Sequence, residues 1–313
     1  MKVTFRATTT FLIFLVMNFF SFRASAQCGL SIIANNISAT WDITWVMQSV
    51  SVTVSKANPA ACTFGLGITK GAAADYNRYA SDGALQLRYQ VYNNIAGTNI
   101  IKDAPDTVTV NDVVMVTLPA GSGPQIVQYY FDIPYALATA PFVAHAGTYT
   151  DSITINAYEG ADPSLYAAPP ATSAVVGISV LIEKLIKLSL IDLGGVFVDG
   201  ATTKSVNFGK LTSGEISRFN MAMQTNAGFS ISLSSANGGN LKHVTSASLI
   251  PYTLTVNNVA ADMTGVIPAA NGGGQTSLNG LIYPVKITVG AIPGNAVAGN
   301  YADVVTITAV VTE

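Results

Sequence analysis

Two segments of the chain, residues 146–157 and 298–309, are near copies, with seven of twelve aligned positions identical. Each begins Ala-Gly-x-Tyr-x-Asp and continues with alternating residues, which is typical of a β-strand. A repeat marks a repeated folding unit, so two related β domains are expected. About 150 residues follow the first copy, whereas only residues 310–313 follow the second. The second domain is therefore expected to lack its last strand, leaving an open sheet edge that can pair with another molecule.

Short β-branched segments with a period of two occupy much of the remaining sequence. Residues 49–55 and 85–92 alternate in the first half, and the second half offers residues 204–208 and 304–311. Turn-forming Asn, Gly and Pro residues separate such segments, and no long amphipathic helix is evident. This pattern predicts an all-β fold of two tandem immunoglobulin-like β-sandwich domains, the C-terminal one lacking its last strand.

The N-terminus resembles a secretory signal peptide. A basic start, an apolar run at residues 11–17 and the sequence Ala24-Ser25-Ala26 predict cleavage after residue 26. A membrane anchor is the alternative, but the apolar run is too short to favour it. The predicted division is a signal peptide at 1–26, an N-terminal domain at 27–160, a Pro/Ala-rich linker at 161–175 and a C-terminal domain at 176–313. The mature protein is accordingly expected to be secreted.

Cysteine content and charge agree with an exported β protein. Cys28 and Cys62 are the only cysteines, and an oxidising compartment predicts that they form a disulfide. Cleavage of the signal would remove three basic residues and no acidic ones, changing the net charge from −2 to −5. Only 10% of the residues are charged. This composition argues against nucleic-acid binding, which needs a clustered basic face.

Several motifs together resemble the spore coat protein U domain family, from which pili of the archaic chaperone–usher type are built. In the first half they are the cysteine pair, the strand at 87–92 and the Ala-Gly-x-Tyr-x-Asp strand. In the second half residues 206–211, 224–229 and 250–254 are similar to pilin domains of that family, although the cysteine pair is absent.

The resemblance implies a pilin domain whose missing strand is supplied first by a periplasmic chaperone and then by the next pilus subunit, at an outer-membrane usher. The acceptor edge would be formed by Val304, Val305, Ile307 and Val310. Only Gln27 would precede Cys28 in the mature chain, leaving no donor extension. The chain is therefore expected to be a tip adhesin, exported through the periplasm to the cell surface, that attaches to an abiotic or host surface and promotes biofilm formation.

Two uncharged loops, at residues 95–101 and 135–143, are the candidates for the adhesive surface, because exposed apolar patches commonly mark contact sites. The alternative is that their side chains cover the end of the sandwich. The candidate contact residues are Ile95, Ile100, Ile101, Tyr135, Leu137 and Phe142.

Residues that could support catalysis are sparse and scattered. His145 and His243 stand alone, without a neighbour at metal-ligand spacing. Asp151 and Asp303 occupy the same repeat position in different domains, so they are expected to cap turns rather than form a carboxylate pair. We therefore expect no enzyme activity, no metal and no cofactor. The remaining alternative is a structural spore-coat or outer-layer protein with the same fold and no pilus.

Overall fold

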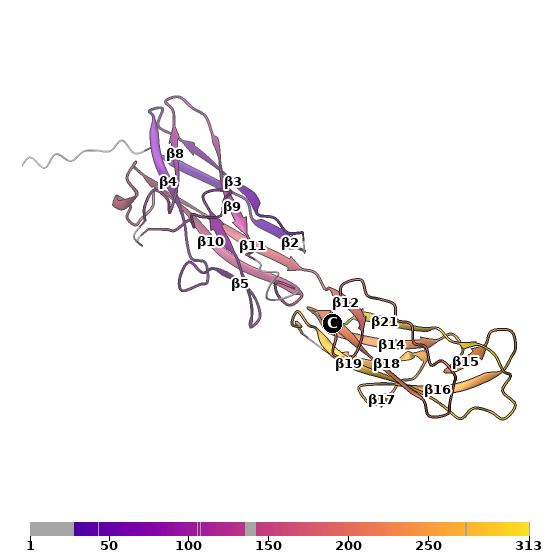
Figure 1. Ribbon diagram of the computed structural model, residues 1–313. Coiled ribbons are helices and arrows are strands. Elements are labelled where there is room, and N and C mark those ends of the chain that lie inside the picture. Colours follow the sequence, from indigo (N-terminus) through magenta and orange to yellow (C-terminus); the bar gives the residue numbers. More distant parts are fainter. Residues whose placement is uncertain are drawn as a thin grey trace, which may run out of the picture.

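The computed structural model describes residues 28–42, 44–104, 106, 108–134, 142–272 and 274–312, so the predicted signal peptide lies outside the described residues. The described chain consists of β-strands and one short 3₁₀ turn, η1 (Pro163–Leu165), which confirms the predicted all-β class. Its strands form two lobes that follow one another along an elongated molecule (Figure 1). No helix in the described part of the chain is long and apolar enough to cross a membrane.

The N-terminal lobe, residues 28–182, contains two facing sheets. One sheet has the order β1-β3-β9-β7; the other has the order β2-β11-β10-β4-β8, with β5 pairing β10 and β6 pairing β5. The strands are β1 (Leu30–Ala34), β2 (Ile37–Trp41), β3 (Gln48–Lys56), β4 (Cys62–Ile68), β5 (Tyr79–Asp82), β6 (Leu85–Arg88), β7 (Gln90–Tyr92), β8 (Val114–Leu118), β9 (Gln125–Asp132), β10 (Gly147–Glu159) and β11 (Thr172–Ile182).

The period-two pattern places alternate side chains of both sheets in one core. Val52 and Val54 of β3 and Ile153 and Ile155 of β10 are each no more than 1% exposed. Arg78 is also fully buried, and its guanidinium donates to the carbonyls of residues 68, 69 and 101. Burial lowers the pKa of Arg78 to about 10, so this side chain remains charged at neutral pH. The buried charge is thus compensated by backbone oxygens.

Strand β11 corrects the predicted domain boundaries. It pairs antiparallel with β10 along its whole length and parallel with β2 from Ile178 to Ile182. Residues 172–175 are therefore part of a strand rather than of a linker, and residues 176–182 belong to the N-terminal lobe. The Pro-rich stretch before β11 is a packed loop, in which the Tyr166 ring stacks on Tyr158 at 5.2 Å between centroids.

A disulfide joins Cys28 to Cys62, as predicted, and spans 34 residues. Replacing Cys28 by Ser should lower the unfolding free energy of the N-terminal lobe by about 3–4 kcal/mol, because the unfolded chain regains its loop entropy. The C-terminal lobe should be unaffected. Calorimetry of the mature chain would measure both transitions, and thiol labelling of the denatured, unreduced wild type should detect no free cysteine. Full labelling of Cys28 and Cys62 in the wild type would contradict the pairing.

The C-terminal lobe, residues 186–312, also has two sheets. Their orders are β12-β13-β19-β16-β15-β20, with β17 pairing β16, and β18-β14-β21. The strands are β12 (Ile186–Ile191), β13 (Ile216–Thr225), β14 (Phe229–Ser235), β15 (Asn240–His243), β16 (Leu249–Val256), β17 (Val259–Ala260), β18 (Thr264–Gly272), β19 (Leu281–Val289), β20 (Tyr301–Ala302) and β21 (Val305–Val311). Of the described side chains, ten form its buried apolar core, against thirty in the N-terminal lobe.

Only three residues, 183–185, separate β11 from β12, and Asn226 holds this short connection. Its side-chain amide donates to the carbonyl of Glu183 (2.9 Å) and its oxygen accepts from the amide of Leu185 (2.8 Å). The carbonyl of Asn226 also accepts from the amide of Ala146 in the N-terminal lobe (2.9 Å). Asn226 itself is completely buried, so these bonds hold the connection between the two lobes from within the junction.

Replacing Asn226 by Ala should therefore loosen the junction. The substitution leaves the partly buried backbone groups of residues 183 and 185 without their partner, at a cost of about 0.5–1.5 kcal/mol for each lost bond. Spin labels on cysteines introduced at Gln125 and Thr253, one in each lobe, should report a narrow distance distribution in the wild type and a broad one in the variant. Asn300→Ala, on the exposed far side of the C-terminal lobe, is the matched control. Equal widths in all three proteins would contradict this role.

Candidate functional site: an open groove in the C-terminal lobe

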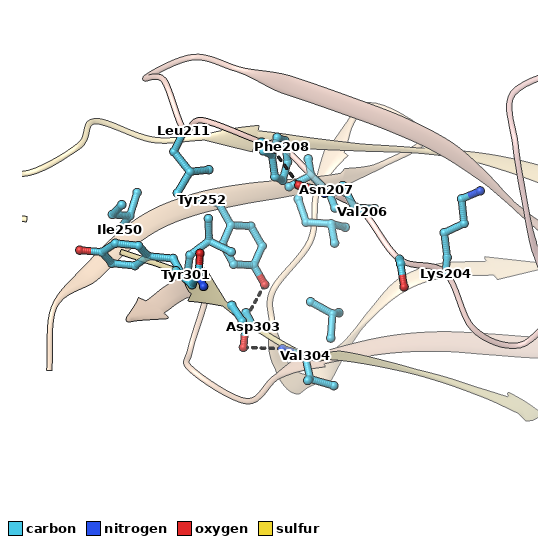
Figure 2. Close-up of a pocket in the computed structure, with 18 of the residues that line it drawn as sticks. Lys204, Val206, Asn207, Phe208, Leu211, Ile250, Tyr252, Tyr301, Asp303 and Val304 are labelled. Atoms are coloured by element: carbon cyan, nitrogen blue, oxygen red, sulfur yellow. Dashed lines mark hydrogen bonds between the residues drawn. The ribbon is translucent and has the colours of Figure 1, made fainter. Parts of the chain in front are cut away.

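An open groove of about 880 Å³ runs along the C-terminal lobe, where its two sheets fail to close over the core. Figure 2 shows Val206, Phe208 and Leu211 along one side, Asp303 and Val304 along the other, and Tyr252 between them. Apolar side chains of the lobe also contribute to the lining: Leu190, Phe219, Leu241, Ile250, Leu254 and Ile287. The groove thus exposes part of the hydrophobic core.

The first rim of the groove is strand β21. This strand pairs with β14 from Phe229↔Val311 to Ser235↔Val305, and no other described strand pairs with its opposite edge. Its side chains alternate, so Val305 and Ile307 pack against the core and line the groove. Val304 also lines the groove, although it is 67% exposed.

Val310 does not belong to the groove lining and is 49% exposed. Its place in the acceptor edge stays a prediction: Val310 lies in β21, the edge strand of its sheet, while the period of two directs its neighbour Ala309 toward the core.

The second rim is the extended segment 202–211. Lys204, Val206 and Phe208 are half-buried, whereas the residues between them are exposed, which is the alternation of a β-strand. Among the described residues, no backbone hydrogen bond joins 203–211 to the remainder of the lobe. Residues 204–208 were predicted to form a strand; the structure keeps the extended alternation but provides no strand partner. Sequence reasoning identified the strand pattern here without identifying its place at a groove.

The loop before this rim is fastened to β12. The amide of Leu190 donates to the carbonyl of Ala201 (2.7 Å), and the Lys187 ammonium pairs with the Asp199 carboxylate at 2.7 Å. Lys204 makes a further ion pair with Asp192. The segment is thus held beside the groove by its N-terminal end, while its own backbone groups are left available for pairing.

A polar cluster lies at one end of the groove. The carboxylate of Asp303 accepts from the Tyr252 hydroxyl (2.6 Å), the Ser235 hydroxyl (2.6 Å) and the backbone amide of Asn237 (3.1 Å). Burial, together with the bond to Asp303, raises the pKa of Tyr252, so its hydroxyl stays protonated and donates. The cluster fixes the start of β21 rather than presenting a free reactive group.

The N-terminal lobe repeats this arrangement. Asp151 accepts from the Tyr89 hydroxyl (2.5 Å) and from the amide of Ala72 (3.1 Å). The two aspartates thus lie in separate lobes and each binds a backbone amide, as the repeat predicted. The tyrosines of the repeat also make equivalent bonds, since Tyr149 donates to the carbonyl four residues earlier (3.1 Å) and Tyr301 does the same (2.7 Å).

The two histidines have structural surroundings. His243 is buried rather than exposed in a loop, because its Nδ1 accepts from the amide of Thr245 (3.2 Å) and its Nε2 lies 3.2 Å from the carbonyl of Ala298. His145 lies at the junction, with Nε2 3.5 Å from the amide of Gln275. Within the described residues, no three His, Cys, Asp or Glu side chains gather where they could hold a metal.

Comparison with known proteins agrees with the sequence motifs. Residues 22–156 match the model of the Spore Coat Protein U domain. The match covers fewer than half of the 313 residues, and this part of the chain is similar to that domain. No curated protein matches the chain.

Solved structures with similarity to the chain include pilus proteins. A chaperone–tip adhesion subunit complex of archaic chaperone–usher Csu pili from Acinetobacter baumannii has 12% identity and a TM-score of 0.41, covering 90% of this chain and 99% of the other. A chaperone–tip adhesin complex of CFA/I fimbriae has 11% identity and a TM-score of 0.32, with coverage of 89% and 96%. The CooA pilin subunit of enterotoxigenic Escherichia coli has 7% identity and a TM-score of 0.29, with coverage of 50% and 99%.

The residues of the predicted adhesive loops in the N-terminal lobe differ in their exposure. Ile95 is 74% exposed and Ile100 is half-buried, so both can reach a partner. Ile101 is completely buried, with its amide and carbonyl bonded to Val91 and Arg78, and its assignment to the surface is wrong. Tyr135 and Leu137 lie outside the described residues.

Phe142 is only 1% exposed, so its assignment to a binding surface is also wrong. It lies at the junction of the lobes, where its carbonyl accepts from the Gln275 side chain. Phe142→Asp should therefore lower the unfolding free energy by at least about 3 kcal/mol, the lower end of the cost of emptying a buried aromatic site. Ile95→Asp, at an exposed position, should leave stability within about 0.5 kcal/mol. Thermal unfolding measures both, and unchanged stability in Phe142→Asp would contradict its burial.

Proposed function

We propose that this chain is a non-enzymatic tip subunit of a chaperone–usher pilus that mediates surface attachment and biofilm formation. In this proposal the C-terminal lobe anchors the chain by accepting a β-strand from another subunit, and the N-terminal lobe carries the adhesive surface. The chain would be exported through the periplasm and displayed at the cell surface.

The observation that carries the proposal is the groove with two unpaired rims. Its lining is largely apolar, with the half-buried Val206 and Ile307 lying over the buried Leu254. Each Å² of such surface left in water costs about 25 cal/mol, so the lobe gains stability from an occupant. Strand addition also satisfies the free N–H and C=O groups of both rims, which a small molecule could not do.

The position at the fibre end is supported by a difference between the lobes. The N-terminal lobe is closed by its own strand β11, whereas the C-terminal lobe is open. Every strand in the described residues already belongs to a sheet, so this part of the chain has none to donate. In this proposal the chain accepts one strand and donates none, which would place it at the end of a fibre.

The partners of such a subunit would act in order. A periplasmic chaperone would fill the groove during export, an outer-membrane usher would receive the complex, and the next pilus subunit would then replace the chaperone strand. The surface partner, abiotic or host, would meet the exposed side of the N-terminal lobe, with Ile95 and the predicted residues Tyr135 and Leu137 as candidates.

Immunogold electron microscopy of producing cells, with antibodies against residues 27–182, tests this proposal. We expect gold at the free ends of thin fibres. Gold distributed along the fibres would overturn the tip assignment. Gold in a continuous layer over cells or spores without fibres would favour the alternative, a structural coat or outer-layer protein.

A further inference from the structure

The internal repeat identifies the strand that the groove lacks. It aligns Gly147–Ala157 of β10 with residues 299–309 of β20 and β21. In the N-terminal lobe β10 pairs with β4 on one side, as β21 pairs with β14 in the C-terminal lobe. The other side of β10 is covered by β11, whereas the other side of β21 is the groove. Strand β11 therefore provides a template for the occupant.

The template has a distinct distribution of side-chain size. Four large inward residues of β11, Val176, Ile178, Val180 and Ile182, are each no more than 2% exposed. The inward positions before them carry only Ala174 and Thr172, which are half-buried. The large residues thus gather in the C-terminal part of the strand.

The pairing register carries this distribution over to the groove. In the N-terminal lobe the large residues lie opposite Ile153, Asp151, Tyr149 and Gly147, in that order, and Ala174 lies opposite Ile155. The aligned positions in the second copy are Val305, Asp303, Tyr301 and Gly299, and then Ile307. All five belong to the groove lining, which does not extend past Ile307 among the described residues. The groove is thus open along the stretch where β11 is bulky.

The second rim has a counterpart as well. Strand β2 runs parallel to β11, pairing with its residues 178–182, and alternates between buried and exposed side chains. Residues 204–208 show the same alternation and, like β2, follow the first strand of their lobe. Unlike β2, residues 204–208 have no neighbouring strand to pair with among the described residues. An occupant shaped like β11 would supply it.

We propose that the occupant of the groove is a strand of another polypeptide that runs antiparallel to β21 and parallel to residues 204–208. It places four large aliphatic side chains opposite Val305, Asp303, Tyr301 and Gly299, and a small one opposite Ile307. This proposal rests on the proposed function and adds the register, the direction and the side-chain pattern of the donated strand.

The test uses the full mature chain with a copy of residues 172–182 appended after Glu313 through a short Gly/Ser loop, as suits an antiparallel neighbour. The copy carries Val175→Cys, an outward position. The register places it directly opposite Thr306, because Val175 pairs with Thr154 in the N-terminal lobe. Single cysteines are introduced at Thr306, Val304 or Thr308. A two-residue slip moves the pair apart by about 7 Å, beyond the reach of a disulfide.

We expect the new disulfide to form with Thr306→Cys and to be lost with the other two. It should also be lost when the copy carries Ile178→Asp, an inward change, and retained with Leu181→Asp, an outward change. Ala174→Trp in the copy should abolish it, because that position meets Ile307. If the disulfide still formed with Ala174→Trp in the copy, the proposal that a small side chain lies opposite Ile307 would be refuted.

Two other outcomes separate this proposal from the proposed function. A disulfide at Val304→Cys or Thr308→Cys, in a chain that the copy stabilises, would overturn the register but leave strand acceptance intact. No disulfide at any position and no stabilisation by the copy would overturn both.

Discussion

Ending the N-terminal lobe at residue 171 instead of Ile182 should abolish its folding. The missing strand, β11, pairs with β10 at eleven positions and with β2 at five. It also buries Val176, Ile178, Val180 and Ile182 almost completely. At about 1.5–3 kcal/mol for each buried aliphatic side chain, its loss removes about 6–12 kcal/mol, as much as the whole net stability of a typical domain.

Three chains measure this effect: residues 27–182, 27–176 and 27–171. Near-ultraviolet circular dichroism and size-exclusion chromatography should show a folded monomer for the first and loss of fixed packing for the third. The chain ending at Val176 should resemble the third, because three of the four large side chains are still missing. A folded monomer without β11 would contradict the assignment of this strand to the N-terminal lobe.

Supplying the missing strand to the C-terminal lobe should have a comparable effect in the opposite direction. The appended copy of residues 172–182 would bury four aliphatic side chains in the groove, a gain of up to about 6–12 kcal/mol before the cost of ordering the strand. In calorimetry of the full mature chain, a net gain of about 2.5 kcal/mol should raise the transition of the C-terminal lobe by about 10 °C, since 1 kcal/mol corresponds to about 4 °C for a domain of this size.

The matched control is the same copy with Asp at the positions of Val176, Ile178 and Val180, which keeps chain length but cannot enter the groove. It should leave the C-terminal transition where the unextended chain has it. The N-terminal transition should be the same in all three proteins, because that lobe already contains its own β11. An equal rise with the aspartate copy would show that the extension, not groove filling, is responsible.

The repeat was the most informative part of the sequence. It predicted both β10 and the strand at β20 and β21, and the aspartates that bind backbone amides near their starts. Such features are local, since each depends on residues that alternate or bond within one turn. The disulfide could be predicted equally well, because two cysteines in a chain expected to be exported have only each other to pair with.

The domain boundary at the end of β11 could not be predicted from the sequence in the same way. Residues 161–171 are rich in Pro and Ala, a composition shared by extended spacers and by loops packed on a sheet. Tertiary contacts distinguish the packed loop from a spacer, since Pro163 is buried and Tyr166 stacks on Tyr158. The prediction of adhesive residues was wrong at Ile101 and Phe142 for a related reason. Their apolar character in the sequence is the same whether the side chains face solvent or the core. At residues 204–208 alternation predicted the strand, but pairing depends on a partner that the described chain does not contain.

Hydrogen–deuterium exchange of the full mature chain tests the central claim most directly, that the C-terminal lobe is an incomplete sandwich awaiting a strand. In the unextended chain, amides in residues 203–211 and on the free edge of β21 should exchange rapidly. With the appended copy of residues 172–182 both regions should be protected by at least about tenfold, as expected for paired strands. Strong protection of both regions in the unextended chain, unchanged by the copy, would contradict the account, because it would show that the lobe is already complete.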